Sequence, residues 1–113
     1  MRRLLLLVSL LTGCGADDPR PPTVEVIATE ILAPTCGQVQ CHSTTTMTSG
    51  YGFDTLAAAK VALKKLTSPQ HKGRGLDEVL TATGGSRMPP DSPLDPADIT
   101  LIQTWLANGA PGL

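Results

Sequence analysis

The sequence predicts an all-α protein with three or four short helices separated by long loops. Apolar residues recur at intervals of three and four in several segments, which places them on one face of a helix. No segment shows the apolar–polar alternation typical of a half-buried strand, and no internal repeat is present. The stretches between the periodic segments are rich in Gly, Pro, Ser and Thr, which favour turns and loops.

The first helix is expected to follow Thr23, whose hydroxyl suits the N-cap position. Val24, Ile27 and Ile31 recur after it at helical spacing. Proline lacks the backbone N–H and disfavours a helical conformation in the residue before it. We therefore expect this helix to end at Pro34.

The middle of the chain is expected to alternate loops with two further helices. Residues 36–52 are rich in Thr, Ser and Gly and predict a loop, after which Asp54 can cap a second helix. The apolar face of that helix is formed by Leu56, Ala59, Leu63 and Leu66. Residues 68–75 form a polar break and residues 76–82 a short third helix, whereas residues 83–93 contain too much Gly and Pro for a regular element.

The last helix has the clearest boundary signals. Asp95 suits the N-cap, Pro96 the first helical position, and Asp98 the first turn, where a carboxylate meets the positive end of the helix dipole. Gly109 provides the stop. One face carries the apolar residues Ile99, Ile102 and Leu106, with Trp105 beside it.

The predicted core is thin for a domain of this size. The chain contains one Phe, one Tyr and one Trp, although aromatic side chains normally supply much of the buried area of a core. Small domains with little core are usually held together by a disulfide, a metal or a cofactor. The composition therefore indicates such an element without choosing among the three.

The N-terminal residues are typical of a secretory signal peptide. Arg2 and Arg3 precede a short apolar stretch at residues 4–11, which is well below the roughly 20 residues of a spanning helix. The sequence Leu11-Thr12-Gly13-Cys14 then resembles the lipobox of bacterial lipoproteins. That resemblance implies cleavage before Cys14 and attachment of lipid to its sulfur. In the alternative, the signal is an ordinary cleaved one and Cys14 is incidental.

These features divide the chain into three parts. We expect a signal peptide at residues 1–13, a lipidated Cys14 with a flexible tether over residues 14–22, and one folded domain at residues 23–113. The expected location is the cell envelope, anchored by lipid and facing the periplasm, in either the inner or the outer membrane.

Removing Arg2 and Arg3 leaves seven basic and ten acidic residues, a net charge of −3, which disfavours binding to nucleic acid.

Chemistry is expected at Cys36-Gly37-Gln38-Val39-Gln40-Cys41-His42. Two cysteines followed at once by histidine is the haem-attachment arrangement of c-type cytochromes, which usually have two residues between the cysteines where this chain has four. In an oxidising compartment this pair can instead form a disulfide. A zinc site at Cys36, Cys41 and His42 is disfavoured because zinc usually takes a fourth ligand from a second element.

A second candidate element is Met88-Pro89. A thioether sulfur suits the distal side of haem iron, and proline keeps the residue before it extended without helical support. Taken alone, Met88 reads as a filler of the core. His71, in a polar loop, is the competing distal ligand, and Met47 is a weaker one.

The order of these elements resembles the small bacterial c-type cytochromes. Their chains read Cys…Cys-His…Met-Pro…Ile…Trp-Leu…Gly-Ala, which corresponds here to Cys36, Cys41, His42, Met88, Pro89, Ile102, Trp105, Leu106, Gly109 and Ala110. The resemblance covers residues 23–111. It implies a cytochrome-c-like fold around one haem c, with Cys36 and Cys41 as haem thioethers, His42 as the proximal iron ligand and Met88 as the distal one. It also implies that the first and last helices cross, so that the haem supplies the missing core.

The expected function is that of an electron carrier, not an enzyme. Its partners are expected to be redox proteins, together with the membrane through the lipid anchor, and the chain is expected to be monomeric. A peroxidase-like or sensor activity stays open if the distal side of the iron is free. The alternative function is that of a haem-free lipoprotein module, with a Cys36–Cys41 disulfide, that acts in binding or structure.

Overall fold

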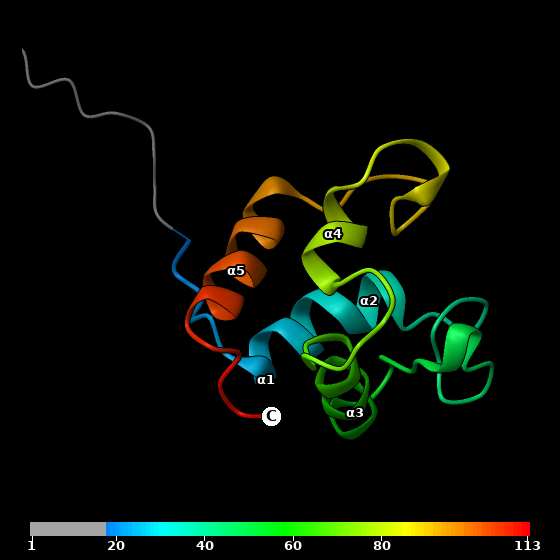
Figure 1. Cartoon of the computed structure of the whole chain (residues 1–113), viewed down its shortest axis with the longest axis horizontal. Coiled ribbons are helices and arrows are strands. Elements are labelled where there is room, and N and C mark those ends of the chain that lie inside the picture. Colours follow the sequence, from blue (N-terminus) through cyan, green and yellow to red (C-terminus); the bar gives the residue numbers. More distant parts are fainter. Residues whose placement is uncertain (1–17) are drawn as a thin grey trace, which may run out of the picture.

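A central helix runs from Val24 to Cys36, and the other helices pack around it (Figure 1). The computed structural model describes residues 18–113; half of these residues are helical and none of them lies in a strand. The prediction of an all-α class is confirmed to that extent. The expected signal peptide, the lipidation residue Cys14 and the start of the tether lie outside the described residues.

The central helix is longer than predicted. It begins as α1 (Val24–Val26), continues as a π-helical stretch η1 (Ile27–Leu32) and ends as α2 (Ala33–Cys36). The side chain of Thr23 caps it as expected, accepting a hydrogen bond from the amide of Val26 at 3.3 Å. The predicted end at Pro34 is wrong. A proline ring in an α-helix meets the carbonyl four residues earlier, and the wider π-helical turns before Pro34 relieve that contact.

The second helix has a different cap from the predicted one. Helix α3 (Leu56–Leu66) is capped by Thr55, whose hydroxyl accepts a hydrogen bond from the amide of Ala58 at 3.1 Å. The carboxylate of Asp54 instead accepts two bonds from the amide and hydroxyl of Thr44, each 2.8 Å long. Desolvation alone would raise the pKa of Asp54, but these bonds to Thr44 leave it below its ordinary value.

Two further helices complete the domain. Helix α4 (Leu76–Thr81) follows the predicted polar break, and only a short 3-10 turn (Gly84–Ser86) interrupts the irregular segment after it. Helix α5 (Pro96–Ala107) begins as predicted, because Asp95 accepts a hydrogen bond from the amide of Ala97 at 2.8 Å. Beyond its end Gly109 has φ 89°, the left-handed conformation that glycine adopts easily.

The core lies where α3 and α5 pack against the π-helical stretch, while α4 packs against α5 (Figure 1). Trp105 is fully buried, and its indole N–H donates to the carbonyl of Pro111 at 3.0 Å. Fully buried aliphatic side chains surround it in one cluster, among them Val24, Ile27, Ile31, Leu32, Leu63 and Ile102. The first and last helices therefore share a core, and Leu106, which is only partly buried, packs at its margin.

The last residues of the expected tether are held against the domain by an ion pair. The guanidinium of Arg20 lies 2.7 Å from the carboxylate of Asp98 in α5 and the same distance from that of Asp18. The hydrogen bonds from Arg20 lower the pKa of Asp18 to about 2. Along residues 18–113 no helix combines the length and apolar character needed to cross a membrane.

We expect Gly37→Ala to destabilise the fold. A Cβ at Gly37 would lie 2.7 Å from the carbonyl oxygen of Ala33 and 2.8 Å from backbone atoms of Phe53 and Asp54, none of which can rotate away. Overpacking of this kind typically costs about 1–3 kcal/mol. Urea denaturation measures the loss. Gly85→Ala is the matched control, because nothing lies within 4 Å of its Cβ position; equal stabilities of the two variants would contradict the prediction.

Candidate functional site

The segment that carries both cysteines folds into a closed loop. It leaves the central helix at Cys36, and the amide of Cys41 donates to the carbonyl of Gln38 at 2.9 Å to form a turn. The amide of His42 then donates to the carbonyl of Cys36, also at 2.9 Å. The backbone of the first cysteine and that of the histidine are therefore in contact, and the four residues between the two cysteines form a bulge.

The imidazole of His42 is held in one orientation. Its Nδ1 lies 2.8 Å from the carbonyl oxygen of Thr48. Because a carbonyl only accepts hydrogen bonds, Nδ1 carries the hydrogen, and in the neutral ring Nε2 keeps its lone pair. Metal-binding histidines commonly have this arrangement, with the second nitrogen bonded to a backbone carbonyl.

Two aromatic rings flank the imidazole of His42. The ring of Phe53 lies edge-on at a centroid distance of 5.7 Å, and that of Tyr51 lies at 6.1 Å. The amide of Phe53 also donates to the carbonyl of His42 at 2.6 Å. Sequence reasoning missed both aromatic residues. Their position in a Gly-rich loop gave no periodic signal, although the scarcity of aromatics in this chain marked each one as worth locating.

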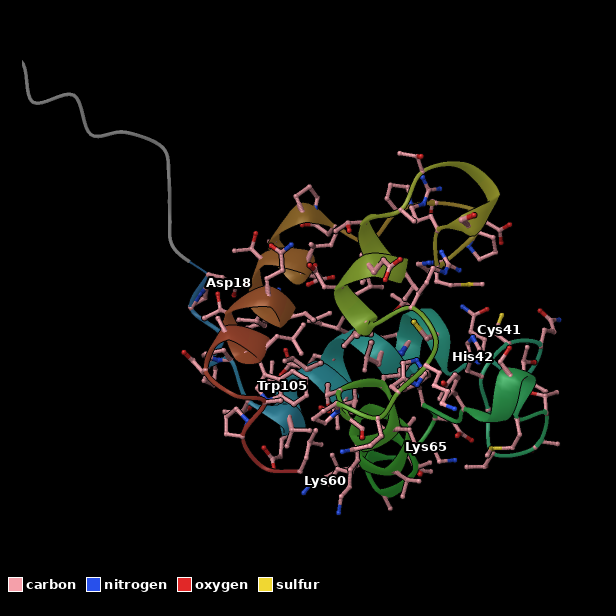
Figure 2. All side chains as sticks on the ribbon, viewed as in Figure 1. Asp18, Cys41, His42, Lys60, Lys65 and Trp105 are labelled. Carbon is pink, nitrogen blue, oxygen red and sulfur yellow. The ribbon has the colours of Figure 1, made fainter. Side chains whose placement is uncertain are left out.

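The predicted site residues surround a common space. A cavity of about 240 Å³ and a smaller one of about 180 Å³ share three lining side chains, those of Cys36, His42 and Met88. Cys41 lines the smaller cavity, and Figure 2 shows it beside His42 on the loop that leaves the central helix. Together the two cavities reach the lower part of the roughly 300–1,000 Å³ range of small-molecule sites.

Met88 and Met47 differ in their relation to this space. Met88 lines both cavities, and its amide donates to the carbonyl of Val79, at the end of α4, at 2.9 Å. Its side chain is 37% exposed, which is unusual for a core filler. Met47 is 44% exposed and lines neither cavity. Of the two methionines, Met88 is the one that lines the cavities together with Cys36 and His42.

His71 also lines the larger cavity. Its Nε2 lies 3.2 Å from the carbonyl of Arg74, so this nitrogen carries the hydrogen and Nδ1 keeps a lone pair. The guanidinium of Arg74 in turn donates to the carbonyl of Ser86 at 2.6 Å, which links the His71 loop to the segment just before Met88. His71 and Met88 thus both stay candidates for a ligand facing the same space.

The two cysteines are unbridged in the structure. Burial raises the pKa of the Cys36 thiol above its ordinary value, and the Thr35 hydroxyl lies 3.4 Å from its sulfur. Across residues 18–113 no three His, Cys, Asp or Glu side chains gather into a metal-binding group.

The lining of the two cavities is mostly apolar. Among the described residues that line them there is no carboxylate, and Arg74 is the one arginine or lysine. Leu32, Leu66 and Val79 contribute apolar surface to the larger cavity. The space therefore suits a largely apolar group, with one cation among its lining residues.

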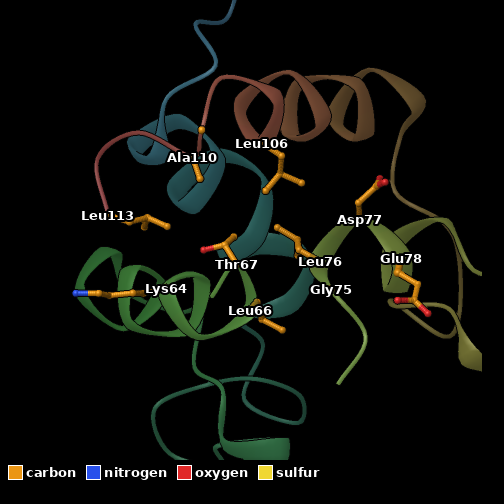
Figure 3. A pocket seen from close by; sticks show the side chains of 11 residues that line it. Lys64, Leu66, Thr67, Gly75, Leu76, Asp77, Glu78, Leu106, Ala110 and Leu113 are labelled. Atoms are coloured by element: carbon orange, nitrogen blue, oxygen red, sulfur yellow. The ribbon is translucent and has the colours of Figure 1, made fainter. Parts of the chain in front are cut away.

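A larger hollow than these two cavities lies elsewhere in the described chain (Figure 3). It has a volume of about 680 Å³ and lies between the end of α3, the start of α4 and the chain after α5. Lys64 lies at one rim and Asp77 and Glu78 at the other, with Leu106 directed between them. None of the predicted site residues lines it.

Comparisons of the chain with protein-family models, with curated proteins and with solved structures returned no match. The functional assignment therefore rests on the side chains that surround the two shared cavities.

Proposed function

We propose that this protein is an electron carrier that holds one covalently bound haem c and is anchored by lipid at Cys14, facing the periplasm. The observation that carries the proposal is the convergence of Cys36, Cys41, His42 and Met88 on one space. Met88 is remote in sequence from the other three, so their meeting is a property of the fold.

The residues present fit this cofactor. The imidazole Nε2 of His42 has a free lone pair because Nδ1 is bound to Thr48. A thioether sulfur from Met88 and two unbridged thiols line the same space. One imidazole, one thioether and two thiols are the donor set that haem c uses in proteins.

Each residue has a distinct role in the proposal. Cys36 and Cys41 attach the macrocycle to the chain as thioethers, and His42 binds the iron on the proximal side. Met88 binds on the distal side, where methionine raises the reduction potential. When bound, the haem iron supplies reversible one-electron transfer. The apolar walls of the cavity would lower the polarity around the haem, which also influences the potential.

The fold supports a cytochrome-c-like arrangement in our proposal. The central helix delivers Cys36 at its C-terminal end, and α5 packs across the π-helical stretch of the same helix. Trp105 and Ile102 of α5 share the core with Ile27 and Ile31. This is the pairing of first and last helices that the resemblance to c-type cytochromes implies.

Covalent haem is the direct test. The chain, expressed in a bacterium with cytochrome c maturation machinery, should gain the mass of one haem, and the absorbance should stay with the polypeptide after extraction into acidic organic solvent. The variant Cys36→Ala/Cys41→Ala is the control and should retain no covalent haem. A colourless wild-type product that has lost two hydrogens would instead indicate the disulfide of the haem-free alternative.

Met88→Ala should leave the haem attached and change the distal side of the iron. The thioethers and His42 do not depend on the sulfur of Met88, so the covalent yield should be unchanged. Loss of the sulfur should lower the reduction potential, abolish the weak near-infrared band of ferric iron bound to methionine, and allow cyanide to bind. His71→Ala is the matched comparison. If the potential and the band respond to His71 and ignore Met88, the distal assignment is wrong and the haem assignment stands.

Cys14→Ala should release the protein from membranes. Several acyl chains on one N-terminal cysteine give stable attachment, and the substitution removes the point of attachment. The visible spectrum should not change, because Cys14 precedes the folded domain. Detergent phase partitioning measures the release; a Cys14→Ala protein that stays in the detergent phase would refute the lipobox assignment.

A further inference from the structure

One buried polar side chain of the described structure has no role in the proposed chemistry. Ser43 is 2% exposed and is the only polar residue of residues 18–113 in the buried class. It directly follows His42, and its hydroxyl faces Thr46. A buried hydroxyl is tolerated where it is fully hydrogen-bonded, so its partners show what it organises.

The hydrogens of this pair can be assigned from the distances. The hydroxyl oxygens of Ser43 and Thr46 lie 2.9 Å apart, and the amide of Thr46 donates to the Ser43 oxygen at 3.2 Å. The Thr46 hydroxyl has its shortest contact, 2.8 Å, with the carbonyl of Val39. Because that carbonyl only accepts, Thr46 donates its single hydroxyl hydrogen to Val39. The Ser43 hydroxyl then donates to Thr46 at 2.9 Å, the shorter of its two contacts, since the carbonyl of Val39 lies 3.5 Å away.

The acceptor at the end of this chain of bonds lies inside the cysteine motif. Val39 is the third of the four residues that separate Cys36 from Cys41, and its side chain is 68% exposed, so apolar packing does not hold it. The Thr46 hydroxyl also lies 3.1 Å from the carbonyl of Cys41. The hydroxyl of Thr46 therefore contacts two backbone carbonyls of the segment that carries the cysteines, one within the bulge and one at Cys41.

The same turn also orients the histidine. The amide of Met47 donates to the carbonyl of Ser43 at 2.8 Å, which closes the turn. The carbonyl of Thr48, directly after it, accepts the hydrogen of His42 Nδ1. Residues 43–48 thus hold both the middle of the bulge and the imidazole ring.

We propose that Ser43 and Thr46 are positioning residues that hold the four-residue spacing between Cys36 and Cys41 in the shape required for haem attachment. A segment two residues longer than the usual one has more conformations to lose, and the bonds from Thr46 restrict them in advance. The proposal rests on the proposed haem function, but its structural part can be measured on the chain whether or not haem is bound.

The test compares three substitutions in the full-length chain. Thr46→Val keeps the shape and removes the hydroxyl, whereas Thr46→Ser keeps the hydroxyl. Thr45→Val is the control, because Thr45 is exposed and its side chain makes none of the hydrogen bonds found in residues 18–113. The first readout is amide hydrogen exchange of peptides spanning residues 37–47 in the protein as isolated. The second is the fraction of chains carrying two thioether bonds, from mass spectrometry.

Thr46→Val should accelerate exchange in this segment by about threefold to tenfold, the effect expected for one net hydrogen bond. It should also lower the fraction carrying two thioethers, while Thr46→Ser and Thr45→Val should match the wild type in both readouts. The proposal is overturned if Thr46→Val behaves like Thr45→Val, or if Thr46→Ser is as impaired as Thr46→Val, because the hydroxyl would then not be the cause.

A shortened motif separates this role from general stability. Deleting Val39 and Gln40 gives the usual two-residue spacing and removes the carbonyl that Thr46 supports. The carbonyl of Cys41, the second contact of the Thr46 hydroxyl, remains in that background, so Thr46→Val should lower the attached fraction less than it does in the wild type. An equal loss in both backgrounds would overturn the proposal. If the wild type carries no haem but Thr46→Val still accelerates exchange, the haem function has failed and the support of the bulge stands.

Discussion

The close contact at Gly37 determines how the rest of the site is arranged. The central helix ends there with its backbone against that of Phe53 and Asp54, so closely that no Cβ fits between them. Residues 38–52 are therefore a loop whose two ends are held close together, and most of its residues are exposed. This constraint brings His42 and the turn after it beside Cys36, at the opening of the shared cavities.

The apolar side chains are buried to different extents at Trp105 and around Cys36. Trp105, which Figure 2 shows far from Cys41 and His42, is fully buried with aliphatic residues of the central helix, and this cluster extends to Leu32, which lines the larger cavity. Around Cys36 the apolar groups instead line open space, and Met88 remains 37% exposed. The fully buried core around Trp105 is therefore bordered by two hollow regions, one at Cys36 and Met88 and one between α3, α4 and the chain after α5.

The parts of the fold that were predictable are those set by local chemistry. Thr23 and Asp95 cap helices as expected, because an N-cap needs only a side-chain acceptor next to its own helix. The predicted helix end at Pro34 was wrong because a π-helical stretch precedes the proline. The predicted cap at Asp54 was wrong because its carboxylate accepts hydrogen bonds from Thr44, ten residues earlier, instead of capping α3. The cysteine motif could be found from sequence. The roles of Ser43 and Thr48 could not, since they depend on the three-dimensional course of a loop without periodicity.

The remaining question of ligand choice is structural as well as chemical. His71 and Met88 belong to different loops, yet the guanidinium of Arg74 joins the two by donating to the carbonyl of Ser86, and the carbonyl of Arg74 accepts from His71. The segment that carries Met88 has a second attachment, because the amide of Met88 donates to the carbonyl of Val79 in α4. The nitrogen of His71 that donates to the carbonyl of Arg74 carries a hydrogen, so only the other nitrogen has a lone pair for the proposed iron. The methionine has no such competing bond on its sulfur, so its binding to iron sacrifices nothing in the loop that carries it. Within the proposed haem function, this difference and the place of Met88 in both cavities favour Met88 over His71 as the distal ligand.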